Sequence, residues 1–212
     1  IHIECFDNSN IQGSNPTASC VVFKNLKPTK SEYRHFKIKS VTGVDDYKSM
    51  EEVVYRRYKG LIKRNESLPQ LIVIDGGKGQ LSSAIKSLKS LGIDKIITII
   101  AIAKRLEEIF FPEDPIPLYL DKKSETLRII QQIRNESHRF AINLHRKIRN
   151  KISVSSKLDE ISGIGPKTKI KILNKFKSLK RVKEVTEKDL IKLLGNKKGK
   201  MIYKEVHLMG KE

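Results

Sequence analysis

Short apolar segments separated by turn-forming residues dominate the start of the chain. Residues 1–7, 18–24 and 32–38 are typical of strands, and turns rich in Asn, Gly and Pro are expected at 8–15 and 25–28. Three strands joined in sequence by turns predict an antiparallel meander as the first part of the fold.

The pattern then alternates between helix and strand. Apolar residues recur at helical spacing in 45–63 and in 80–91, and the second of these segments stops at Gly92. The continuous apolar runs at 71–74 and 96–103 are too short for helices and predict strands buried on both faces. A strand, a helix and a strand in this order predict a parallel crossover unit.

The remaining pattern divides the chain in two. The proline-interrupted segment 109–120 predicts an edge strand or a loop, and apolar spacing predicts a long helix from Glu125 to Asn150. We therefore expect an α/β domain at 1–152, with a mixed sheet of antiparallel and parallel strands flanked by helices. A hydroxyl-rich linker at 153–157 and a small all-α domain at 158–212 are expected to follow.

Charge distinguishes the two parts. The formal net charge is +19, from 43 Lys and Arg residues against 24 Asp and Glu residues. Residues 144–212 hold 20 basic and 7 acidic residues, a net +13, which leaves +6 for the longer remainder. A lysine-rich composition bias would spread the excess evenly along the chain. The asymmetry instead predicts a polyanionic partner such as a nucleic acid.

Several classes of protein are disfavoured. Cys5 and Cys20 form neither a disulfide framework nor a zinc-ligand spacing, and we expect both to be buried thiols in a reducing cytoplasm. The longest apolar stretch is far below the ~20 residues needed to cross a bilayer, so no membrane association is expected. The chain begins at Ile1 within a strand-like segment, which indicates a fragment of a longer protein.

Asp75 is the first candidate for chemistry. It ends the buried strand at 71–74 and is followed by Gly76-Gly77-Lys78-Gly79-Gln80. A carboxylate at the end of a buried strand costs several kcal/mol to desolvate unless a cation meets it. The position therefore indicates a metal ion or a bound phosphate, although capping of the following helix explains an Asp here equally well. The glycines lack the spacing of a nucleotide-binding loop.

Asp7 and His138 extend this candidate site. If the first strand neighbours the Asp75 strand, Asp7 and Asp75 converge, and a divalent cation would relieve the repulsion between their carboxylates. Two carboxylates and an imidazole suit Mg²⁺ or Mn²⁺ better than Zn²⁺ or Ca²⁺. Two alternatives stay open: Asp7 could begin an Asx turn, and a lone histidine on a helix is more often packed or exposed than a ligand.

A second candidate site lies in the basic part of the chain. Gly163, Ile164 and Gly165 predict a tight turn, after which Pro166 opens a helix. Backbone N–H groups at such a turn bind a phosphate well, and Lys167, Lys169 and Lys171 lie beside them. A plain connection between helices is the alternative. A weaker second copy is expected, with helices at 186–194 and 200–209 around a turn at 195–199.

Seven blocks of the sequence resemble the C-terminal half of UvrC, the nuclease subunit of bacterial nucleotide excision repair. The resemblance covers essentially the whole chain in order. The blocks are Glu4-Cys5-Phe6-Asp7, Ala18-Ser19-Cys20-Val21-Val22-Phe23, Glu32-Tyr33-Arg34, Asp45-Asp46-Tyr47, Ile74-Asp75-Gly76-Gly77-Lys78-Gly79-Gln80-Leu81, Arg134-Asn135-Glu136-Ser137-His138-Arg139-Phe140-Ala141 and Ile161-Ser162-Gly163-Ile164-Gly165-Pro166-Lys167.

The resemblance implies an RNase H-like endonuclease domain followed by a tandem helix-hairpin-helix domain. It implies incision 5′ to a DNA lesion with a divalent metal, Mg²⁺ or Mn²⁺, at a catalytic set formed by Asp7, Asp75 and His138. Asp46 matches a further acidic position important for this incision. Implied partners are damaged double-stranded DNA and UvrB, whose contact region we expect to be absent from this chain. Asn8 departs from the family, which usually has Ile there, and the second hairpin is degenerate.

Phosphate contacts are expected beyond the first hairpin. Lys78, Arg139 and Arg146 are candidate neighbours of the DNA backbone near the proposed catalytic set. Two other functions remain as alternatives. One is a non-catalytic DNA-binding scaffold in which the acidic residues only cap helices, and the other is an RNase H-type nuclease acting on RNA–DNA hybrids, a type that lacks this hairpin tail.

Overall fold

The chain forms two compact units, Ile1–Leu144 and His145–Glu212, and each is described by itself. Within the described residues, no helix combines the length and the apolar character required to cross a membrane. The computed structural model describes residues 1–11, 14–41, 43, 45–103, 106–159, 164–176, 181 and 184–208.

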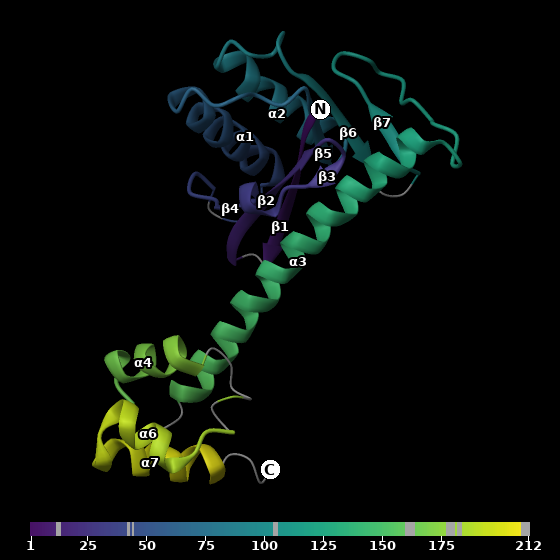
Figure 1. Ribbon diagram of the computed structural model, residues 1–212. Helices are drawn as coiled ribbons and strands as arrows, with labels where there is room; N and C mark the ends of the chain where they lie inside the picture. The colour runs from purple at the N-terminus through teal and green to yellow at the C-terminus, as the bar shows by residue number, and fades with distance from the viewer. Residues whose placement is uncertain are drawn as a thin grey trace. The chain divides into compact units, whose positions relative to one another are not determined.

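A seven-stranded mixed sheet forms the centre of the first unit (Figure 1). The strand order is β3-β2-β1-β5-β6-β7, and β4 pairs with β2 beside this path. The pairs β1–β5 and β5–β6 are parallel, whereas β1–β2, β2–β4 and β6–β7 are antiparallel, so the predicted mixed sheet is confirmed. The strands are β1 His2–Ile11, β2 Ser14–Lys24, β3 Lys27–Pro28, β4 Arg34–Lys37, β5 Leu71–Asp75, β6 Thr98–Ala103 and β7 Glu108–Phe110.

The first hairpin is longer than the sequence indicated. β1 and β2 remain paired up to Ile11 and Ser14, so the predicted turn at 8–15 is wrong for most of its length. Pairing with a neighbouring strand satisfies the backbone and overrides the local turn preference of Asn and Ser. The second predicted turn is confined to Asn25 and Leu26, whose φ angles of 50° and 60° give the left-handed conformation of a tight hairpin turn.

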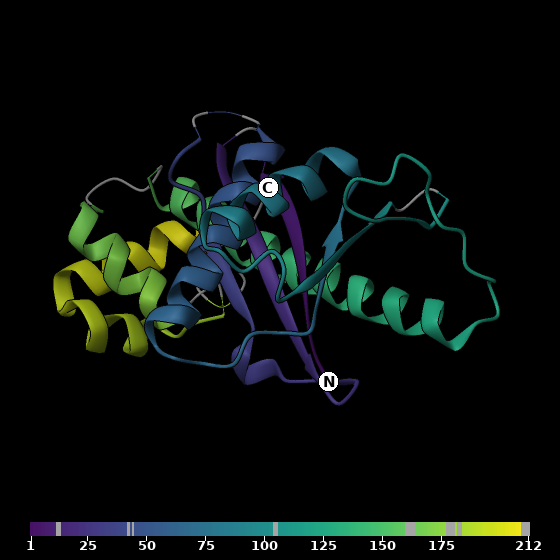
Figure 2. The ribbon, with the colours of Figure 1, turned by 90° about the horizontal axis from the view of Figure 1, so that it is seen from above.

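Helices cover both faces of this sheet. α1 (Asp46–Lys63) packs beside α2 (Lys78–Ser90), and α3 (Glu125–Asp159) crosses the sheet separately (Figure 2). The Tyr58 hydroxyl of α1 contacts the side chain of Glu4 on β1, whereas His138 of α3 contacts the side chain of Asp7, three positions further along the strand. Successive side chains of a strand point to opposite faces, so α1 and α3 lie on opposite faces of the sheet. The core between them is apolar and fully buried at Tyr58, Phe6, Phe23, Met50, Ile72, Ile74 and Leu88.

The long helix continues beyond its predicted end. α3 runs to Asp159, so residues 153–157 are helical rather than an irregular connection. No glycine or proline interrupts the chain between 125 and 159, and Ser and Val each cost at most about 0.7 kcal/mol in a helix. Hydroxyl-rich composition alone therefore does not end the helix.

The second unit contains a small helical core. Ile172, Leu190, Ile202 and Val206 are buried together, from α4 (Pro166–Phe176), α6 (Glu187–Leu194) and α7 (Asn196–Leu208). α4 begins at Pro166, as predicted.

The turn predicted at 195–199 is shorter in the structure. Only Gly195, with φ of 86°, separates α6 from α7. Gly199 lies within α7, where a Cβ would approach the backbone nitrogen of Ile191 to 2.6 Å. Its role is therefore close packing between these two helices.

Candidate active site

Two carboxylates lie side by side at the ends of neighbouring strands. Asp7 of β1 and Asp75 of β5 are direct partners in the parallel register, and each residue is nearly buried, at 5% and 8% exposure. Adjacent strands lie about 4.8 Å apart, so side chains on the same face at paired positions are close neighbours. The pairing of β1 with β5 therefore brings the carboxylates of Asp7 and Asp75 together, as a shared metal ion would require.

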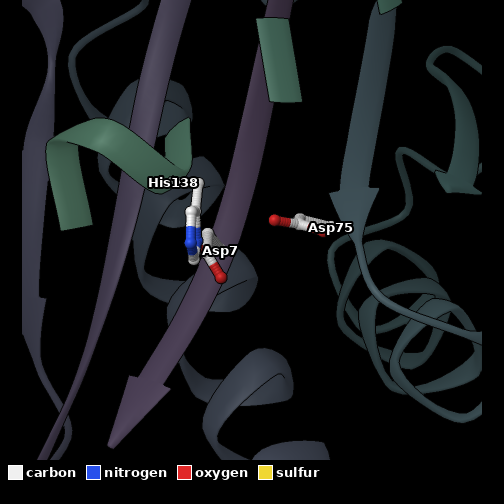
Figure 3. A group of neighbouring side chains, drawn as sticks. All are labelled: Asp7, Asp75 and His138. Atoms are coloured by element: carbon white, nitrogen blue, oxygen red, sulfur yellow. The ribbon is translucent and has the colours of Figure 1, made fainter. Parts of the chain in front are cut away.

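α3 adds an imidazole to these carboxylates. His138 Nδ1 lies 3.2 Å from Asp7 Oδ2, and the imidazole side chain is 45% exposed. Asp75 points toward Asp7 and His138 from the neighbouring strand (Figure 3). One ligand atom from each of the three residues lies within 4.8 Å of the others. The structure thus brings together three residues that are far apart in the sequence.

This donor set fits a divalent cation. Two nearly buried carboxylates at this separation repel each other, and a cation between them would remove that repulsion. Carboxylate oxygens supplemented by an imidazole are ligands suited to Mg²⁺ or Mn²⁺. The two carboxylates also affect the buried thiol of Cys5. Burial raises the pKa of this thiol, and the negative charges of Asp75 and Asp7 raise it further.

Asp45 and Asp46 lie at the N-terminus of α1 and do not belong to the group formed by Asp7, Asp75 and His138. Asp45 caps the helix by accepting a hydrogen bond from the Lys48 backbone N–H at 3.0 Å, which lowers the pKa of its carboxyl. The backbone carbonyl of Asp46 accepts a hydrogen bond from Asn8 Nδ2 at 2.7 Å. Since Asn8 follows Asp7, this contact places the start of α1 next to the strand end that carries the first carboxylate.

Lys78 and Arg139, the predicted phosphate contacts of the first unit, have different partners in the structure. Lys78 Nζ donates to the carbonyl of Pro115 and lies 5.2 Å from the centre of the Phe110 ring. Arg139 donates to both oxygens of Glu136, at 2.6 and 2.7 Å, and these contacts raise the pKa of its guanidinium. A phosphate at Arg139 would have to compete with this carboxylate.

The remaining predicted contacts lie further along the chain. Arg146 is exposed on α3. Gly163 lies outside the described residues, and Ile164 packs, half-buried, on the second core. Gly165 and Lys167 are exposed. Lys169 is half-buried, and its backbone N–H donates to the Gly165 carbonyl at 3.1 Å.

Sequence reasoning missed the residues that hold His138 in place. Ser137 is fully buried, and its hydroxyl donates to the Cys5 carbonyl at 3.4 Å. Ser19 of β2 donates to the Ser137 carbonyl, also at 3.4 Å. A serine in a helix carries no signal of such a role, and only its position beside His138 could have drawn attention to it.

Comparisons with known proteins agree with this architecture. A family model described as the UvrC RNAse H endonuclease domain matches residues 1–142, and a SAM-like helix-hairpin-helix tandem model matches residues 155–207. The UvrABC system protein C of Christiangramia forsetii is 60% identical over 206 residues, and that of Porphyromonas gingivalis strain W83 is 55% identical over 202 residues. These matches cover 97% and 95% of this chain but only 34% of either relative.

Among solved structures, Ciona intestinalis endonuclease V in complex with inosine-containing DNA has 21% identity and a TM-score of 0.35, over 64% of this chain and 56% of its own. That likeness is too low to bear on function. The endonuclease-domain model, by contrast, covers more than half of the chain, and the relatives extend the match to nearly all of it. The chain therefore belongs to the UvrC family and carries its RNase H endonuclease domain followed by a tandem helix-hairpin-helix.

Proposed function

We propose that this chain is the metal-dependent endonuclease portion of a nucleotide excision repair nuclease, which hydrolyses a phosphodiester bond 5′ to a lesion in damaged double-stranded DNA. The observation that carries the proposal is the convergence of Asp7, Asp75 and His138, with ligand atoms within 4.8 Å of one another. In the full-length protein the partner is UvrB. The compartment is the cytoplasm.

The two carboxylates hold the metal ion in this proposal. Asp7 and Asp75 supply hard oxygen ligands for Mg²⁺ or Mn²⁺ and fix its position at the edge of the sheet. When bound, the ion would polarise the phosphate and stabilise the leaving oxygen. Asp46, at the start of α1, adds negative charge beside this set and acts on the same step.

His138 has the geometry to handle the proton of the attacking water. Its Nδ1 faces Asp7 Oδ2 at 3.2 Å, and a proton on Nδ1 directs the lone pair to the other ring nitrogen. The imidazole is partly exposed, so water can reach it. His138 then orients the water and accepts its proton, with a further metal-ligand role as the alternative.

The helix-hairpin-helix unit holds the DNA backbone in this proposal. The turn that the sequence predicts at Gly163, Ile164 and Gly165 is followed by Lys167 and Lys169, and we expect this segment to offer backbone N–H groups and positive charge to a phosphate. Lys78, Arg139 and Arg146 serve phosphates near the catalytic set, where Arg139 must first exchange its contact with Glu136.

Nicking of supercoiled plasmid with Mg²⁺ or Mn²⁺ tests the catalytic assignment. We expect Asp75→Ala to abolish nicking because the ion loses a ligand, while binding of the plasmid in a gel-shift assay persists. Asp94→Ala is the matched control, since Asp94 lies between α2 and β6, at the opposite end of the sheet from Asp75. Titration calorimetry with Mn²⁺ should show binding to the wild type and to Asp94→Ala but not to Asp75→Ala.

Retention of metal-dependent nicking by Asp75→Ala would overturn the assignment. Binding of DNA by a wild type that never nicks it would favour the scaffold alternative. Cleavage of an RNA–DNA hybrid in preference to DNA would favour the RNase H-type alternative.

A further inference from the structure

A cavity of about 670 Å³ lies between the first turns of α1 and α2. It adjoins the proposed catalytic set in two ways. Gly77 follows Asp75 by two positions, and Asn8, which follows Asp7, donates to the carbonyl of Asp46. The cavity is lined by Asp45, Asp46, Tyr47, Gly77, Lys78, Gly79 and Gln80.

Tyr47 is the aromatic residue that lines this cavity, and packing in the hydrophobic core does not explain its position. The residue is 59% exposed and does not belong to the buried cluster of the first unit. Its ring lies against the backbone of Gly79, where a Cβ would approach the ring atom Cζ to 2.7 Å and the hydroxyl oxygen to 2.9 Å. The absence of a side chain at Gly79 therefore allows the ring to lie across the first turn of α2.

Single exposed aromatic residues are common and most need no explanation. Two features set Tyr47 apart: the ring is seated on Gly79, and it lines a cavity that also includes Gly77, two positions after Asp75. An exposed ring in this place offers a flat apolar surface to whatever enters the cavity.

The charges around the cavity indicate which part of a nucleotide would lie there. Asp45 and Asp46 make the wall at α1 negative, which disfavours a phosphate against that wall. A nucleobase is uncharged and flat, and every base has a π-face that stacks on an aromatic ring. Lys78 lies at the α2 side, where it can meet the phosphate that follows the base.

We propose that Tyr47 stacks on a nucleobase that flanks the phosphate hydrolysed at the catalytic set, and that it thereby positions the scissile strand without selecting a sequence. This inference rests on the proposed endonuclease function and adds a substrate-contacting residue to it. Gly79 is a positioning residue because it acts through the Tyr47 ring.

Fluorescence of 2-aminopurine tests the contact independently of cleavage. The bond cut by the wild type in a defined duplex is mapped first, and 2-aminopurine is then placed on either side of it in two separate duplexes. With Ca²⁺ in place of Mg²⁺, we expect wild-type protein to quench one of the two probes strongly, because a stacked base is quenched. Tyr47→Leu, which keeps an apolar side chain on Gly79 but no ring, should lose this quenching.

Four variants separate the ring from other causes. Tyr47→Ala and Tyr47→Leu should raise the KM for incision about tenfold or more while changing kcat less, as expected for the loss of one base-stacking contact. Tyr47→Phe should keep most of the quenching because it keeps the ring. Gly79→Ala should reduce the quenching because the new Cβ displaces the ring. Tyr55→Ala is the control, since Tyr55 lies on α1 outside this cavity and contacts Lys59.

Unchanged quenching and KM in folded Tyr47→Leu would overturn the inference. So would an equal loss in Tyr47→Phe and Tyr47→Ala, which would assign the effect to the hydroxyl rather than to the ring. Failure of the underlying function gives a different result, because the wild type itself would then show no metal-dependent incision.

Discussion

Ser137 precedes the proposed catalytic histidine, His138, and joins α3 to the sheet. Its buried hydroxyl donates to the carbonyl of Cys5, two positions before Asp7, and its own carbonyl accepts from Ser19, the register partner of Asp7 on β2. Ser137 is fully buried, so a larger side chain at this position would have to displace its neighbours. We therefore expect the distance between His138 and Asp7 to depend on the size of residue 137.

Enlarging this side chain should move His138 and weaken metal binding at the proposed site. We expect Ser137→Leu to lose about 1–3 kcal/mol of unfolding free energy through overpacking, and to bind Mn²⁺ at least tenfold more weakly in titration calorimetry. Ser137→Ala removes the hydrogen bonds of the hydroxyl at a cost of about 1 kcal/mol but keeps the spacing, so its Mn²⁺ affinity should stay near that of the wild type. Wild-type Mn²⁺ affinity in Ser137→Leu would contradict this role.

At the scale of elements, a buried ion pair holds α1 against β1 on the face opposite to the proposed metal site. The Glu4 carboxylate accepts hydrogen bonds from Arg57, at 2.5 and 3.1 Å, and from the Tyr58 hydroxyl, at 3.0 Å. Burial opposes its ionisation, but the hydrogen bonds of His2 and Arg57 and the charge of Arg57 outweigh burial and lower the pKa of Glu4 to about 2. The pair thereby fixes the helix whose first residue is Asp46.

This ion pair should be visible in the pH dependence of stability. The folded-state pKa of Glu4 lies below its ordinary value of 4.5, so the contribution of the pair is complete above about pH 4.5 and is lost as the pH falls toward 2. Arg57→Met leaves a buried carboxylate without its cation, and we expect it to cost about 3–5 kcal/mol at pH 7 in urea denaturation. The difference from the wild type should shrink as the pH falls below 4.5.

The control for this measurement is Arg64→Met, whose partner Glu66 is half-exposed like Arg64 itself. Loss of that surface pair should change the unfolding free energy by about 0–1 kcal/mol. A difference between Arg57→Met and the wild type that stays constant from pH 7 to pH 3 would show that the Glu4 pair does not provide the stability assigned to it.

For the whole molecule, charge is distributed unevenly along the chain. Residues 144–212 carry a net +13 of the total +19, whereas the proposed catalytic set of Asp7, Asp75 and His138 lies in the first unit. Lysine and arginine side chains that neutralise phosphates release counterions, which makes the affinity for DNA depend steeply on salt. The proposed function thus assigns hydrolysis and DNA affinity largely to different parts of the chain.

Salt titrations should therefore report on the second unit. We expect Lys167→Ala to weaken binding to double-stranded DNA to a similar extent for all sequences, and to lower the steepness of log Kd against log salt by about 1, the value for one phosphate contact. Lys95→Ala, which removes an exposed lysine of the first unit at the opposite end of the sheet from Asp75, should leave this slope unchanged. An unchanged slope in Lys167→Ala would remove Lys167 from the DNA contact.

Local sequence patterns predicted much of the order of the helices and strands. They failed where contacts with distant parts of the chain determine the local structure. The apolar runs at 71–74 and 96–103 correspond to β5 and β6, because a short run of buried residues restricts the choice to a strand. The turn expected at 8–15 was wrong because strand pairing continues to Ile11 and Ser14. The helical state of 153–157 was missed because polar composition does not by itself end a helix.

The sequence by itself determined the order of strands and helices, an acid at the end of a buried strand and the basic C-terminal part, since these depend on residues close together in the chain. Only the tertiary structure decided that Asp7 pairs with Asp75, that the buried Ser137 hydroxyl donates to the Cys5 carbonyl and that the Tyr47 ring lies on Gly79. Such contacts depend on strand register and on packing across the whole core, which no local pattern specifies.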